Sequence, residues 1–171
     1  MLVNVEQGGA NPSVGTLLRI SDALGVGLPA LLEAAGPDRV TVTRRGEGAT
    51  LWRGATGGRG VLMAGTGPPD VVELWDWTLG AGDRHTSATH APGTKELAQV
   101  QHGAITIEVG ERAIELHVGD AVSFPGDVAH SYANPGKELA RFSLAVFEPA
   151  LGSVTSVRSG QSGKQLAAPD A

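Results

Sequence analysis

The sequence contains no cysteine, which excludes disulfides, thiolate metal sites and a cysteine nucleophile. Any bound metal ion must therefore be held by histidine, aspartate or glutamate. Aromatic residues make up only 4% of the chain, against 25 glycines and 10 prolines. This composition indicates short elements joined by many turns, as in an all-β domain rather than a helical bundle.

Long hydrophobic runs are also missing. The N-terminus has neither the basic nor the apolar region of a signal peptide, and no apolar run approaches the roughly 20 residues that span a bilayer. We therefore expect a cytoplasmic protein without membrane contact. The net charge of −5 gives no general attraction to nucleic acid, so any DNA contact would need a local basic face.

Two short helices are predicted near the N-terminus. Residues 11–13 offer capping side chains, and apolar residues at helical spacing then continue as far as Leu24. Gly25 ends this helix. A second helix follows Gly27, with Pro29 in its first turn and leucines at the same spacing.

Beyond these helices the pattern changes to short β-prone runs separated by turn residues, and no helical period follows. The clearest hairpin has apolar residues alternating on both arms around Gly110-Glu111, which predicts a two-residue type II′ turn. The tail from residue 150 is rich in small and polar residues and is expected to be flexible. The predicted strands are 40–43, 51–52, 61–63, 71–79, 105–109, 114–118, 121–124, 130–133 and 141–147.

Two segments carry a family resemblance. The first is His90-Ala-Pro-Gly-Thr-Lys-Glu96 followed by Gly103, and the second runs from Gly119-Asp to His130-Ser-Tyr-Ala-Asn134 with Pro125 between them. Together they resemble the paired motifs of the cupin superfamily. The resemblance covers about residues 68–149 and implies a mainly β fold, a double-stranded β-helix or jelly-roll barrel, with a short helical segment before it.

The resemblance also implies a metal site at His90, Glu96 and His130. Where the family usually has His-x-His, this sequence has His90-Ala91-Pro92, so one imidazole ligand is missing. Two histidines and one carboxylate can hold Zn²⁺, Fe²⁺, Mn²⁺ or Ni²⁺ and leave positions open, but they can equally form a polar cluster without an ion. His85 could replace the lost ligand, although an exposed loop position is the simpler expectation.

Six further residues are predicted by position to line a ligand pocket: Trp75, Trp77, Arg84, Phe124, Tyr132 and Arg141. The two tryptophans share one face of a strand and could instead fill the core or a dimer interface. An arginine among the six could anchor a carboxylate effector. His102 and His117 are expected to be surface residues. No residue is assigned a catalytic role.

Residues 4–32, with the segment Glu6-Gln-Gly-Gly-Ala-Asn-Pro-Ser13, resemble the last half of a lambda-repressor-like (XRE-type) helix-turn-helix domain. The resemblance implies that the earlier helices and most of the recognition helix, which read DNA, are absent from this sequence. Residues 1–38 carry one basic side chain against four acidic ones, so this segment is not expected to bind DNA alone. A start site placed too far downstream or a shortened gene would each explain the missing part.

The chain is therefore expected to consist of four segments: the helix-turn-helix remnant (1–36), the linker and entering strands (37–67), the barrel (68–149) and the tail (150–171). The leading hypothesis is an effector-sensing transcriptional regulator, expected to be a homodimer, that contacts DNA only through the absent helices. The alternative is a metal-dependent enzyme of dioxygenase or isomerase type. A barrel that serves only for dimerisation is the third possibility.

Overall fold

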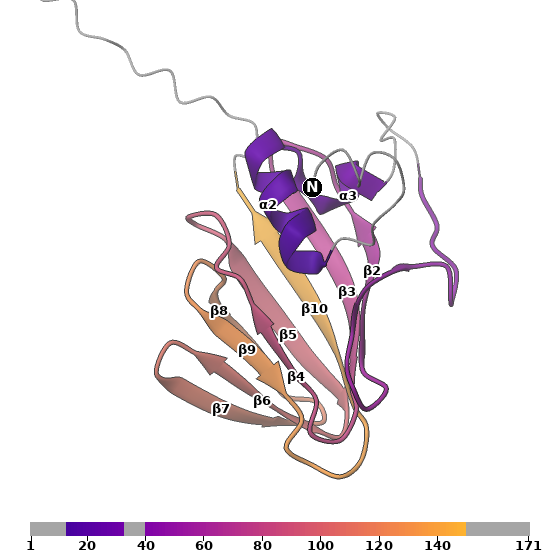
Figure 1. Cartoon of the computed structure of the whole chain (residues 1–171), viewed down its shortest axis with the longest axis vertical. Helices are drawn as coiled ribbons and strands as arrows, with labels where there is room; N and C mark the ends of the chain where they lie inside the picture. Colours follow the sequence, from indigo (N-terminus) through magenta and orange to yellow (C-terminus); the bar gives the residue numbers. More distant parts are fainter. Residues whose placement is uncertain (1–12, 33–39, 150–171) are drawn as a thin grey trace, which may run out of the picture.

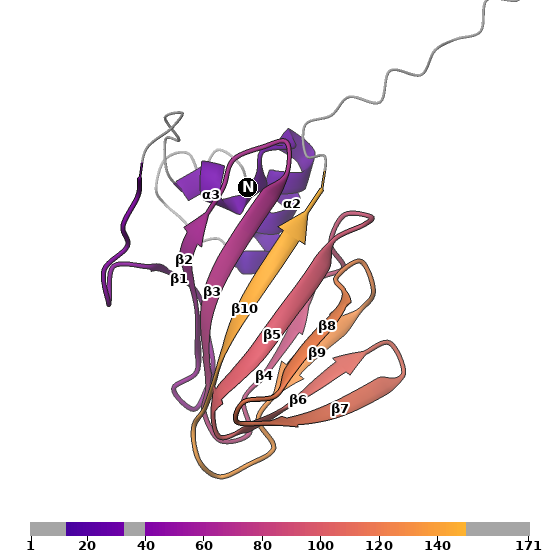
Figure 2. The same ribbon diagram turned by 180° about the vertical axis from the view of Figure 1, so that it is seen from behind.

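The computed structural model describes residues 13–32 and 40–149. Two β-sheets face each other and come together at one end of the molecule, and two short helices lie at the other end, beside β2, β3 and β10 (Figure 1). The turned view shows the strands of the larger sheet running side by side in front of these helices (Figure 2).

Both helices form where the sequence predicts them. Helix α2 (Val14–Leu24) begins after Ser13, whose hydroxyl accepts a hydrogen bond from the Thr16 N–H, and ends at Gly25 with a left-handed φ of 63°. Helix α3 (Gly27–Leu32) follows directly. The buried apolar side chains of both helices belong to the same hydrophobic cluster as the interior of the barrel.

The larger sheet has six strands in the order β1-β2-β3-β10-β5-β8, and every pairing is antiparallel. Its central strands, β3 and β10, pair along their whole length, and their inward side chains form most of one wall of the core. The six strands are β1 (Ala49–Arg53), β2 (Arg59–Gly65), β3 (Val71–Leu79), β10 (Ala140–Glu148), β5 (Lys95–His102) and β8 (Ala121–Pro125).

The smaller sheet has four strands in the order β4-β9-β6-β7. Its hairpin β6–β7 turns at Gly110-Glu111, as predicted, with a φ of 57° at Gly110 that favours glycine. The four strands are β4 (Arg84–Ser87), β9 (His130–Ala133), β6 (Ala104–Val109) and β7 (Arg112–His117).

Three features differ from the sequence prediction. The segment 40–43 forms no strand, and its apolar side chains are exposed, with Val40 at 95% and Val42 at 58%. Strand β5 was not among the predicted strands. Its start has Glu96 inward and Leu97 outward, although the usual alternation holds from Ala98 to Gln101. Strand β4 was also missed, since all its residues are polar. The predictions for residues 4–12 and 150–171 lie outside the described residues.

The end of the barrel away from the helices is closed by a fully paired polar network. The Asp83 carboxylate accepts hydrogen bonds from the backbone N–H groups of Thr56, Gly58 and Gly80. The Asn134 amide donates to the backbone carbonyls of Leu79, Gly80 and Glu138. These bonds tie together loops from both sheets.

Candidate metal centre

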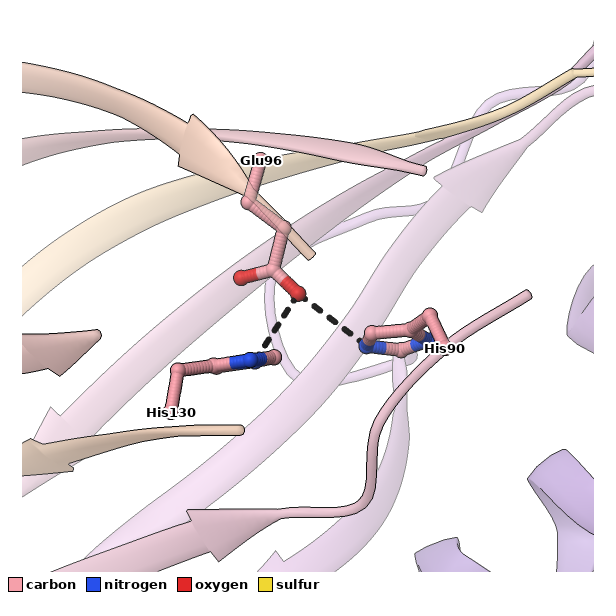
Figure 3. Close-up of side chains that lie close together, drawn as sticks. All are labelled: His90, Glu96 and His130. Carbon is pink, nitrogen blue, oxygen red and sulfur yellow. Dashed lines mark ion pairs between the residues drawn. The ribbon is translucent and has the colours of Figure 1, made fainter. Parts of the chain in front are cut away.

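Three side chains from separate parts of the barrel converge on one point. His90 lies in the loop before β5, Glu96 on β5 and His130 at the start of β9, and Figure 3 shows both imidazoles directed at the same carboxylate oxygen. Glu96 Oε1 is 3.0 Å from His90 Nε2 and 3.1 Å from His130 Nε2. All three side chains are almost completely buried.

The arrangement fits a bound divalent cation. The three ligand atoms lie within 4.8 Å of one another. Donor atoms that share an ion at about 2.0–2.2 Å are themselves separated by about 3–3.5 Å at tetrahedral or octahedral angles, which matches both distances to Glu96. Glu96 Oε1 and His130 Nε2 also have no hydrogen-bond partner, although both atoms are buried. An ion between them would satisfy both.

Each ligand is oriented by a contact through its other polar atom. His130 Nδ1 lies 2.7 Å from the Val128 carbonyl, so it donates to that carbonyl and leaves Nε2 as an acceptor. His90 Nδ1 lies 3.6 Å from Glu148 Oε1. The hydroxyl of Tyr132 donates to Glu96 Oε2. Such contacts fix the rings and the carboxylate before an ion arrives.

The charges of these groups depend strongly on one another. Burial opposes ionisation of Glu96, but the close approach of the His130 and His90 imidazoles outweighs it and lowers its pKa to about 2. Burial likewise opposes the charged form of His90, yet Glu148 and Glu96 raise its pKa to about 10. Burial raises the pKa of Tyr132 well above its usual value. Glu96 is therefore a permanent carboxylate, and a metal ion has to compete with a proton at His90.

A small cavity adjoins two of the three ligands, His90 and Glu96. Its volume is about 20 Å³, which is room for roughly one water molecule. Helix α2 closes one side of it through Val14, so the wall of the cavity is formed partly by the barrel and partly by the helical segment. The cavity is lined by Val14, Glu73, Trp75, Trp77, His85, Ser87, His90, Glu96, Tyr132, Leu144 and Val146.

The predicted pocket residues fall into two groups. Trp75, Trp77 and Tyr132 line the cavity. Phe124 is buried with its ring edge against His130, at a centroid distance of 5.5 Å, and supports that ligand from outside the cavity lining. These four aromatic side chains lie together at the site.

The two predicted arginines do not reach this cavity. Arg84 lies on the outside of the smaller sheet, where its Nη2 is 2.9 Å from Glu108 Oε1, and Arg141 lies on the outside of the larger sheet with Nε 2.7 Å from Asp76 Oδ1. Their side chains are 47% and 51% exposed. Neither can anchor an effector carboxylate inside the barrel, because strand parity directs both outward.

The expectation that His85 lies in an exposed loop is wrong. It lies on β4, with its ring 4.8 Å from that of Trp77 and 5.9 Å from that of Tyr132. Burial lowers its pKa to about 4, so it is neutral near pH 7. It lines the cavity but does not belong to the three-ligand group. His102 and His117 are exposed, as expected.

Two buried glutamates beside the centre were not identified from the sequence. Glu73 on β3 accepts a hydrogen bond from Trp75 Nε1 at 2.9 Å through Oε2, while its Oε1 has no partner. Glu148 on β10 faces His90. Glu73 shares the parity of Trp75 and Trp77, which was the one signal in the sequence that could have indicated an inward carboxylate.

Residues 75–147 match the family described as Cupin domain (Cupin_2). This barrel is a cupin. A solved structure of an HTH_3 family transcriptional regulator from Vibrio cholerae is similar to 87% of this chain and 79% of its own, with 27% identity and a TM-score of 0.59. Its similarity therefore extends well beyond the cupin domain. No curated protein matches the chain.

Two other solved cupins are similar over shorter stretches. The Cupin_2 domain of an XRE family transcriptional regulator from Enterobacter cloacae covers 46% of this chain and 82% of its own, with 23% identity and a TM-score of 0.45. A cupin-superfamily sugar phosphate isomerase from Silicibacter pomeroyi covers 53% and 59%, with 18% identity and a TM-score of 0.43. Among the described residues, no helix is long and apolar enough to cross a membrane.

Proposed function

We propose that this chain is the sensory part of a transcriptional regulator, in which the cupin barrel binds a divalent cation and a small effector. The observation that carries the proposal is the position of helix α2. This helix belongs to the segment that resembles a helix-turn-helix domain, yet its Val14 is a wall of the cavity beside the metal ligands. The similarity to the Vibrio cholerae regulator, which extends beyond the barrel, supports the same conclusion.

His90, Glu96 and His130 would hold the cation, with Zn²⁺, Fe²⁺, Mn²⁺ and Ni²⁺ as the candidates. When bound, such an ion acts as a Lewis acid that accepts an oxygen or nitrogen donor of the effector at an open position. The protein's own contribution is to exclude water, to hold the two imidazoles through Val128 and Glu148, and to keep Glu96 ionised.

The small volume of the cavity couples effector binding to the position of helix α2. An effector larger than one water molecule needs space that Val14 and its neighbours on α2 now fill. Binding is therefore coupled to a shift of α2, and in the full regulator to a change in the DNA-binding helices, which lie outside residues 1–171. We expect the regulator to act as a homodimer, as most helix-turn-helix readers do.

Two measurements on the purified chain test this proposal. A thermal-shift screen of small metabolites, with the metal-loaded protein, identifies a stabilising compound. Hydrogen exchange with and without that compound then reports on residues 14–24. Faster exchange in α2, with the compound unchanged after incubation, supports a sensor. A compound that stabilises the barrel while exchange in α2 stays the same contradicts the coupling.

A metal-dependent cupin enzyme of dioxygenase or isomerase type is the second candidate, and one observation favours it. Burial, together with the nearby Glu148, raises the pKa of Glu73 to about 7, and Glu73 lines the cavity. A carboxylate that titrates near neutral pH beside a metal centre can serve as a general base. Turnover of a compound found in the screen, abolished in Glu73→Gln, would favour the enzyme over the sensor.

A further inference from the structure

A row of arginines crosses the outer face of the larger sheet, where β1, β2, β3 and β10 run side by side (Figure 2). Each of these strands contributes one residue to the row. Arg53 is opposite Arg59, Arg59 is opposite Thr78, and Thr78 is opposite Arg141. Neighbouring strands lie about 4.8 Å apart, so the backbone positions of the three arginines fall within about 14 Å of one another.

This row is unfavourable for the protein alone. Like charges directly opposite each other on neighbouring strands destabilise a sheet, and Arg53 faces Arg59 in this way. Within residues 13–32 and 40–149, neither of these two arginines has an ion-pair partner. Arg141 has one, because its Nε lies 2.7 Å from Asp76 Oδ1. A negative charge that approached Arg59 from solvent would offset part of this repulsion.

Two of these arginines also line a groove on the outer face, together with an arginine from the loop before β1. The volume of the groove is about 880 Å³, compared with about 20 Å³ for the cavity beside the ion centre, and this is enough for a small molecule. Its lining carries three positive charges, from Arg45, Arg59 and Arg141, and one negative charge, from Asp76. The groove is therefore positive, although the chain as a whole has a net charge of −5.

The loop that contributes Arg45 is held in place. A turn closes this loop, because the Arg44 N–H donates to Glu47 Oε2 at 2.9 Å. The loop then packs closely on β2, since a Cβ at Gly48 would lie only 2.7 Å from Val61 Cγ1. Arg45 is thus carried to the groove by a closed turn that rests on the sheet.

We propose that this groove binds a small anion with at least two negative charges, carried by carboxylate or phosphate groups. Arg45, Arg59 and Arg141 contact the anion, and Asp76 orients Arg141. The planar guanidinium group suits this task, because it donates two parallel hydrogen bonds to a carboxylate or a phosphate. The inference goes beyond the proposed function, since none of these residues belongs to the ion centre or lines the cavity beside it.

The test uses sodium phosphate and sodium succinate, each titrated calorimetrically into the purified chain at mildly alkaline pH, where both probes are doubly charged. Ionic strength is kept low and constant, because salt screens exposed charges. We expect saturable binding of at least one probe, at least about tenfold tighter than that of acetate at the same ionic strength. Binding of phosphate alone or of succinate alone identifies the anionic group that the groove prefers.

Arg59→Gln removes the arginine shared by the row and the groove, and it should weaken binding by about tenfold or more. Without an anion this variant should unfold at the same temperature as the parent chain or at a higher one, because the repulsion from Arg53 is gone. Arg45→Gln is a second variant, and it should also weaken binding. Arg112→Gln is the matched control, because Arg112 is exposed on β7 of the smaller sheet and does not line the groove.

Four results would each overturn the site. They are equal binding by the parent chain and Arg59→Gln, an equal loss in Arg112→Gln and Arg59→Gln, acetate binding as tight as that of both probes, and no saturable binding of either probe up to about 10 mM.

The failure of this inference can be told from failure of the proposed function. The double variant His90→Ala, His130→Ala lacks two ion ligands and should bind the probe like the parent chain. If this variant loses the probe, the anion binds at the ion centre and the groove is not its site. A chain that responds to a metabolite with faster exchange in α2, but binds neither phosphate nor succinate, keeps the sensor and loses only the anion groove.

Discussion

The two ends of the barrel treat buried polar groups in opposite ways. At the end near Asp83 and Asn134, each side-chain atom has its hydrogen-bond partners. At the end near α2, buried atoms of Glu73, Glu96 and His130 have none. Since a folded protein seldom leaves such atoms unpaired, the first end is a scaffold and the second is a site prepared for a ligand.

The pKa values of the buried carboxylates also differ between the two ends of the barrel. Burial opposes ionisation of Asp83, but its hydrogen bonds outweigh burial and lower its pKa. Glu73 has hydrogen bonds from Trp75 and from the Leu28 backbone, but burial and the nearby Glu148 outweigh them and raise its pKa to about 7. The balance between donors on one side and burial and like charge on the other therefore decides whether a buried carboxylate is ionised.

The largest effect is expected at the ion site. The double variant His90→Ala, His130→Ala removes two of the three ligands and should lower metal affinity by at least about 100-fold, because even indirect partners of metal ligands contribute about 10–100-fold. Elemental analysis after dialysis measures it. His102→Ala, an exposed histidine, is the control and should retain the metal. Equal metal content in the double variant and the parent would exclude this site.

At the scaffold end, Asp83→Ala should destabilise the fold by about 2–3 kcal/mol, because it leaves the buried N–H groups of Gly58 and Gly80 without an acceptor. Denaturant unfolding measures the change in the free energy of unfolding. Asp76→Ala, on the outer face, is the comparison and should have a much smaller effect. If the two variants unfold at the same denaturant concentration, the closed end does not hold the barrel together.

At the ligand end, Glu73→Gln should stabilise the protein at alkaline pH. The folded pKa of Glu73 is about 7 and its usual value is 4.5, so the parent chain loses stability as pH rises from about 4.5 through 7. This shift corresponds to about 3 kcal/mol at about pH 8, which the glutamine variant does not lose. Thermal unfolding at several pH values measures it. A parent and variant with parallel pH profiles would contradict the burial of an unpaired charge.

The smallest effect is expected at Arg84, whose ion pair with Glu108 is on the surface. Arg84→Ala should change the free energy of unfolding by less than about 1 kcal/mol and leave the metal content unchanged. Denaturant unfolding and elemental analysis measure the two quantities. A variant that loses the metal would show that Arg84 acts on the ion site in spite of its outward position.

The strands with regular alternation could be predicted from the sequence, and 71–79 and 130–133 agree with the structure residue for residue. Strand β5 could not, because a site residue replaces an apolar one at its inward position 96. The outward direction of Arg141 was readable, since Phe142 and Leu144 occupy the opposite parity.

The metal ligands His90, Glu96 and His130 could be proposed together because they lie at characteristic positions of the two sequence motifs. The proximity of Glu73 and Glu148 could not be predicted. They come together only because β3 and β10 pair along their length, with Glu148 opposite Val71, and this register depends on the whole sheet. Glu73 and Glu148 are far apart in the sequence, and no local pattern in either strand indicates that they are neighbours.

Helix α2 resembles part of a helix-turn-helix module by its sequence, but by its packing it belongs to the barrel. Val14 and Leu18 are part of the same core as the barrel tryptophans. A recombination event that exchanged the barrel alone would separate the cavity from its wall. In the regulator that we propose, residues 13–32 are therefore expected to be inherited together with the barrel, and to vary with its ligand rather than with the DNA sequence that the regulator binds.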